Sequence, residues 1–163
     1  MNKLGLFFCF LLAICYVQTE VIDGLDINEL YDKFTIIAKG MAETTEYKCS
    51  NALIKHKTTI LPVVEDIMKS LKNEQELMNK LITASFKLLA LQEFIEGCKI
   101  NEVIQILPNL LKADGIKTMG QNMINNAGEL ENLFKEFTGA SDIEGKNIAI
   151  GKIVRKITGL SFL

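Results

Sequence analysis

The chain has 163 residues, of which 48% are hydrophobic and 23% charged, and its net charge is −2. A phosphate backbone is bound by a basic surface, whereas lysine and glutamate alternate along most of this chain, so nucleic acid is not an expected partner. The single histidine, His56, and the widely spaced cysteines do not form a zinc motif of known spacing. We therefore expect neither a metal nor any other cofactor.

An uninterrupted apolar run from Leu4 to Val17 follows Lys3 and precedes polar residues. This order of a cation, an apolar middle and a polar exit is typical of a secretory signal peptide. The run is shorter than the roughly 20 apolar residues that span a bilayer, which favours cleavage over retention as an anchor. An uncleaved anchor remains the alternative.

Small residues before the cut indicate cleavage after Cys15 or after Thr19. Taking the later position, we expect a signal peptide at residues 1–19 and a single helical domain at residues 20–163. The predicted location is extracellular or in the lumen of the secretory pathway.

Two cysteines, Cys49 and Cys98, remain once Cys9 and Cys15 leave with the signal peptide. An oxidising compartment favours a disulfide between them, and closing a loop of about 50 residues should stabilise the fold by roughly 4 kcal/mol. Two buried free thiols are the alternative. A catalytic Cys49–His56 pair is not expected, because seven residues along a helix separate them by about 10 Å.

Apolar residues recur at three- and four-residue steps in every clear period after the signal peptide, which predicts helices throughout. Asp26 with Glu29 has the spacing of a capping box and should begin the first helix, which weakens at Gly40. A second helical period follows Cys49, and Pro62 predicts a kink or a boundary within it.

The longest apolar period predicts a central helix from Asn73 to Gly97, with Asn73 as its N-cap and Cys98 directly after its end. A second apolar row, which includes Ile82 and Leu89, widens the apolar face. Neighbouring helices should therefore cover most of this helix.

Asn101 should cap the next helix, and we expect a kink at Pro108 and a break in the chain at Gly115. Residues 116–137 keep one helical phase, which fits either one bent helix or two stacked helices.

The last helix should begin at Ser141 or Asp142, after Gly139 ends its predecessor. Asp142 is therefore interpreted as a helix start rather than as part of a calcium loop. The resulting fold class is all-α: a compact bundle of five to seven helices with one disulfide.

Adaptable thioethers on the predicted inward faces could line a pocket for an apolar ligand. The candidate pocket residues are Met78, Leu81, Leu88, Met119 and Met123. Filling the core is the alternative role for these side chains.

The segment 146–163 has cations but no acid, opposite an apolar face. Such a helix can lie on an anionic membrane, with Lys152, Arg155 and Lys156 as the candidate contacts. We favour docking onto the bundle instead, because Ala149 and Gly151 are small enough for close helix packing.

No nucleophile, paired-carboxylate or phosphate-cradling motif is evident, so the chain is not expected to be an enzyme. The leading hypothesis is a secreted, non-catalytic binding or interaction protein with no sizeable void in its core. One alternative is an extracellular carrier of a small apolar or lipid-like ligand, which requires a cavity of about 300 Å³ or more. The other is a membrane-active effector that uses the cationic C-terminal helix. The partner is accordingly an unidentified protein or an apolar small molecule.

Overall fold

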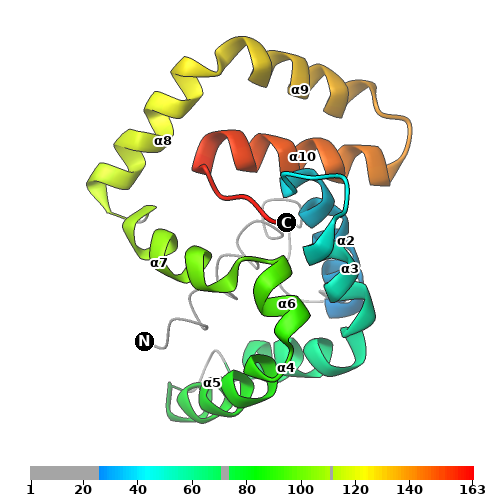
Figure 1. Ribbon diagram of the computed structural model, residues 1–163, viewed down its shortest axis with the longest axis vertical. Helices are drawn as coiled ribbons and strands as arrows, with labels where there is room; N and C mark the ends of the chain where they lie inside the picture. Colours follow the sequence, from blue (N-terminus) through cyan, green and yellow to red (C-terminus); the bar gives the residue numbers. More distant parts are fainter. Residues whose placement is uncertain (1–25, 71–73, 111) are drawn as a thin grey trace.

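The computed structural model describes residues 26–70, 74–110 and 112–163 (Figure 1). Over these ranges the chain is all-helical, as predicted, with nine helices and no strand. The helices are α2 (Ile27–Met41), α3 (Lys48–Lys55), α4 (Lys57–Lys69), α5 (Glu74–Leu89), α6 (Gln92–Gly97), α7 (Ile100–Leu110), α8 (Ala113–Asn125), α9 (Ala127–Gly139) and α10 (Ile143–Thr158). The predicted signal peptide lies outside the described residues.

Two helix starts follow the local signals read from the sequence, whereas α7 begins at Ile100, so the prediction that Asn101 caps this helix is wrong. The side chain of Asp26 accepts hydrogen bonds from the backbone of Asn28 at 2.9 Å and of Glu29 at 3.3 Å. Asp142 likewise accepts from the backbone N–H of Gly145 at 2.6 Å. Each carboxylate satisfies N–H groups that have no partner in the first turn, so both predicted caps are confirmed.

The prediction of five to seven helices is wrong, because the chain breaks at positions that carry no proline or glycine. His56 separates α3 from α4, whereas α4 continues through Pro62, where we expected a kink or a boundary. The expected central helix is divided into α5 and α6 at Leu91, whose φ of −96° and ψ of 77° are not helical. This break redirects the chain, and Phe94 and Cys98 are fully buried beyond it.

Gly115 is also not a break, since it lies in the first turn of α8. A Cβ at this position would lie 2.1 Å from the carbonyl oxygen of Asn109 and 2.4 Å from the Cα of Leu110. The glycine therefore permits close approach between the end of α7 and the start of α8. Residues 116–137 form two helices, which meet at Asn126.

The core is centred on α2, whose buried residues Phe34, Ile37 and Met41 face the other helices. Helix α10 packs against α2 so closely that a Cβ on Gly40 would lie 2.1 Å from the carbonyl oxygen of Ile148. In Figure 1, α8 and α9 form an arch alongside α10. The predicted docking of the C-terminal helix onto the bundle is confirmed.

The segment after α10 crosses back to the first helices. Phe162 is buried, and its backbone N–H donates to the carbonyl oxygen of Met41 at 3.1 Å. The N–H of Leu163 donates to Gly97 at 2.9 Å, and the carbonyl oxygen of Leu163 accepts from Cys49 at 3.0 Å. These bonds connect the end of α2, the start of α3 and the end of α6.

Candidate functional site

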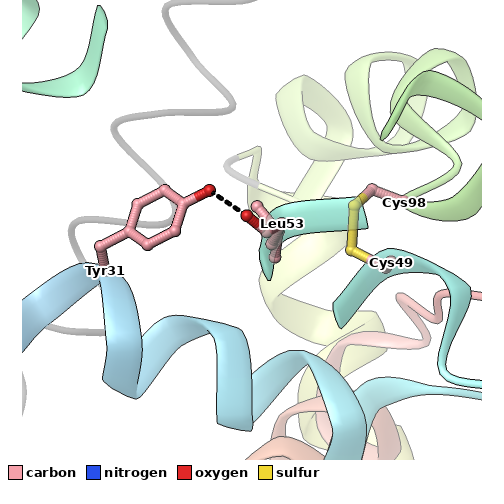
Figure 2. Close-up of a disulfide and its surroundings, with 4 residues drawn as sticks. All are labelled: Tyr31, Cys49, Leu53 and Cys98. Carbon is pink, nitrogen blue, oxygen red and sulfur yellow. Dashed lines mark hydrogen bonds between the residues drawn. A yellow bond between two sulfur atoms is a disulfide. The ribbon is translucent and has the colours of Figure 1, made fainter. Parts of the chain in front are cut away.

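The predicted disulfide is present and joins the first turn of α3 to the residue after α6. Cys49 and Cys98 have an S–S distance of 2.02 Å, and both residues are buried (Figure 2). A disulfide is compatible with an extracellular location.

One turn beyond Cys49, α3 is also bound to α2. The hydroxyl of Tyr31 donates to the carbonyl oxygen of Leu53 at 2.8 Å (Figure 2). Leu53 is among the last four residues of α3, whose carbonyl oxygens have no N–H donor within the helix. The hydroxyl of Tyr31 supplies the missing donor. Burial, and secondarily the negative charge of Asp32, raises the pKa of Tyr31 well above its usual value.

A small ionic cluster lies where the C-terminal segment passes the end of α2. Glu43 accepts hydrogen bonds from the hydroxyl of Ser161 and from Nζ of Lys99, the latter at 2.9 Å. The bond from Ser161, followed by that from Lys99, lowers the pKa of Glu43. Lys99 has a positive φ of 47°, so this pairing forms where the chain turns sharply between α6 and α7.

A cleft of about 270 Å³ lies between α3 and α6, next to the disulfide. We call it the α3–α6 cleft. The residues that line it from each helix are spaced so that they lie on one face of that helix. They are Lys48, Asn51, Ala52 and Lys55 from α3, and Glu93, Glu96 and Gly97 from α6.

Different contacts join the two helices at the two ends of the α3–α6 cleft. At the disulfide end the helices are in backbone contact, because a Cβ on Gly97 would lie 2.9 Å from the carbonyl carbon of Lys48. At the far end, Nζ of Lys55 lies 2.7 and 2.8 Å from the two carboxylate oxygens of Glu93. Nε2 of His56 is 3.4 Å from one of them. Hydrogen bonds from Lys55 and then His56 lower the pKa of Glu93.

This arrangement is suited to holding charged groups. His56 and Glu93 resemble a base and its orienting carboxylate, but none of the lining residues is a serine, threonine or cysteine that the pair could activate. No group of three or more potential metal ligands occurs among the described residues. The cleft therefore offers opposite charges on facing walls rather than an activated nucleophile.

Three candidate apolar-pocket residues have described side chains, and none of them lines this cleft. Leu88 is fully buried in the core, and Met119 is half-buried against it. Met123 is 49% exposed, so the expectation that it faces inward is wrong. The reason is the orientation of α8, which contacts α10 through Asn122, whose side-chain amide donates to the carbonyl oxygen of Ile157 at 3.0 Å. The side chains of Met78 and Leu81 lie outside the described part.

The three candidate membrane-contact cations are each engaged by another part of the fold. The pairs are Lys152 with Glu136 at 2.8 Å, Lys156 with Glu129, and Arg155 with the carbonyl oxygen of Ala42. Two of the three cations thus help to hold α9 against α10.

Helix α5 carries three large exposed apolar side chains. Ile82 is 47% exposed, Phe86 74% and Leu89 64%, and their spacing places them along one side of the helix. We call these three residues the α5 apolar face. On the other side of α5, Ala84 and Leu88 are buried. The expectation that neighbouring helices cover most of this helix is therefore wrong.

No protein-family model matches the chain, and no curated protein or solved structure matches it either. Among the helices of the described ranges, none is long and apolar enough to cross a membrane. The function is therefore inferred from the geometry of the surface.

Proposed function

We propose that this protein is a secreted, non-catalytic interaction protein that contacts another macromolecule through the α5 apolar face. The observation that carries the proposal is the exposure of Ile82, Phe86 and Leu89 along one side of a single helix. Isolated exposed apolar residues are normal on protein surfaces, whereas adjacent ones that form a patch are typical of contact surfaces.

The spacing of these residues supports contact with a groove. Apolar side chains at i, i+4 and i+7 are the anchors with which a helix is recognised by a hydrophobic groove. Phe86, at the centre of the face, is the most exposed of the three. Burying an aromatic side chain of this kind can remove roughly 150 Å² or more from water.

The other candidate functions have less support in the described residues. A carrier of an apolar ligand requires an apolar cavity of about 300 Å³ or more, whereas the α3–α6 cleft is smaller and has charged side chains on both walls. A membrane-active helix needs free cations, but Lys152, Arg155 and Lys156 are engaged within the fold.

Photo-crosslinking tests the proposal. A benzoylphenylalanine at position 86, in protein added back to the extracellular fluid of its source, should give one defined crosslinked product. Adding Leu89→Ser to that chain should abolish the product, because it removes a neighbouring anchor. The matched control places the same probe at Ile124, which is 76% exposed on α8.

Position 124 should give no product of the same mass. A product that forms equally from both positions, or that survives the loss of Leu89, would show that exposure alone explains the crosslinking. The absence of any product from position 86 would also refute the proposal.

A further inference from the structure

We infer that the α3–α6 cleft binds a small zwitterionic molecule that carries both an ammonium and a carboxylate group, of which a free α-amino acid is the simplest example. The inference is independent of the α5 apolar face. It follows from the segregation of charge on the two walls, since the lysines that line the cleft come from α3 and the glutamates from α6.

The far end of the cleft is already neutralised. Lys55 makes hydrogen bonds to both carboxylate oxygens of Glu93. This pair satisfies the charges at one end and leaves Lys48 and Glu96, nearer the disulfide, as the groups that a ligand would engage. Facing charges of opposite sign favour a ligand with both signs, because a ligand with one charge is repelled by one of the two walls.

The present partners of Lys48 and Glu96 are local and weakly held. Nζ of Lys48 lies 3.1 Å from Glu46, and the two side chains are 57% and 66% exposed. Glu96 accepts a hydrogen bond from Gln92, four residues earlier on the same helix. Exposed pairs of this kind contribute little free energy, so a ligand carboxylate can replace Glu46 and a ligand ammonium can approach Glu96 at small cost.

The size of the cleft sets the size of the ligand. A volume of about 270 Å³ corresponds to about nine water molecules at about 30 Å³ each. L-leucine, with nine bonded non-hydrogen atoms, takes up less space than nine separate waters and is therefore small enough to enter the cleft. Ala52 is buried and Gly97 has no side chain, so these two residues give the lining an apolar part, beside the polar Asn51, that can accept an aliphatic side chain.

The walls are held at a constant separation by covalent and backbone contacts. The disulfide places the Cα atoms of Cys49 and Cys98 4.4 Å apart. The backbone of Leu163 then bonds to both Cys49 and Gly97. A site on rigid elements loses little entropy when it binds, which favours measurable affinity from few contacts.

The test is a titration followed by amide chemical shifts, with the disulfide-bonded protein at about pH 6, where carboxylates are ionised and amines protonated. L-leucine should shift the amides of Lys48, Asn51, Glu96 and Gly97, with a Kd in the millimolar range. L-leucinamide keeps only the positive charge and N-acetyl-L-leucine only the negative one. Each should bind at least about fivefold more weakly.

Lys48→Met and Glu96→Gln each remove one charge from an exposed side chain and should weaken L-leucine binding about fivefold or more. Lys69→Met is the matched control, because Lys69 is 70% exposed on α4 and lies outside the cleft. It should leave the affinity unchanged. The inference is overturned if L-leucine causes no shifts at the cleft up to about 50 mM. Equal binding of L-leucine and either analogue to the unaltered protein would overturn it too.

Discussion

Adding a methyl group at Gly151 tests the close contact between α2 and α10. The new Cβ would lie 2.1 Å from the carbonyl oxygen of Ile37 and 2.8 Å from the Cα of Gly40. Both opposing atoms belong to the backbone, so no side-chain rotation relieves the clash and the helices must separate by about 1 Å.

Overpacking that forces the backbone to shift costs about 1–3 kcal/mol, and two backbone contacts this short place Gly151→Ala at the upper end of that range. The higher helix propensity of alanine offsets about 1 kcal/mol of that cost. We therefore expect Gly151→Ala to lower the free energy of unfolding by about 2 kcal/mol.

The measurement is urea unfolding followed by circular dichroism under non-reducing conditions. Gly120→Ala is the matched control, since Gly120 lies in the middle of α8 and an added Cβ would have no neighbour within 4 Å. This control should raise the free energy of unfolding by up to about 1 kcal/mol. If Gly151→Ala is as stable as the unaltered protein, or gains stability like the control, α2 and α10 are not in backbone contact.

Three further predictions concern the bonds that hold the first helices together. Replacing Cys49 and Cys98 together with alanine should lower the free energy of unfolding by roughly 4 kcal/mol, measured by urea unfolding, because the separation of 49 residues closes a long loop; a loss below about 1 kcal/mol would contradict this. Tyr31→Phe should cost about 1 kcal/mol near neutral pH, because the carbonyl of Leu53 loses its donor. The raised pKa of Tyr31 also means that the unfolded chain ionises first, so stability should fall above about pH 10, and this fall should be smaller in Tyr31→Phe. The lowered pKa of Glu43 has the opposite effect on the pH dependence of stability. The stabilisation by the ionised Glu43 carboxylate is present above the ordinary pKa of 4.5 and is lost as the pH falls through the lower pKa of the folded state. Glu43→Gln should therefore flatten the acid limb of the stability profile, and an unchanged limb would count against the Ser161 and Lys99 contacts.

The helix ends that the sequence predicted correctly are those decided within a few residues. Asp26 and Asp142 cap their helices through bonds that span at most three residues. Gly97 and Gly139 end α6 and α9 as expected. Such signals are readable because the cap and the groups that it satisfies are neighbours in the chain.

The breaks that the sequence did not predict depend on contacts between distant segments. Leu91 interrupts the expected central helix without a proline or glycine, and the following turn buries Phe94 and Cys98. Gly115 is a glycine because the end of α7 lies against it, not because the chain bends there. The sequence shows which residue stands at each of these positions. It does not show which distant residue that position contacts in the fold, and that contact decides whether the helix breaks.

The cleft was missed for a related reason. Its two walls come from residues more than 30 positions apart, and neither wall has a recognisable motif. The signal that could have found it is the predicted disulfide. Once Cys49 and Cys98 are paired, residues within two turns of each, such as Lys55 and Glu93, become candidates for contact across the two helices.

Because the α5 apolar face is exposed, its contribution to binding can be measured separately from its contribution to folding. The core side of α5 is already occupied by Ala84 and Leu88, and Phe86 is 74% exposed. Phe86→Ser should therefore change the free energy of unfolding by no more than about 0.5 kcal/mol, as is usual for substitutions at exposed positions. An apolar side chain that adds so little to folding while remaining in water is expected to stabilise a complex instead. If Phe86→Ser destabilises the protein by 2 kcal/mol or more, on the order of a core truncation, then Phe86 is covered within the chain and α5 has no free apolar face.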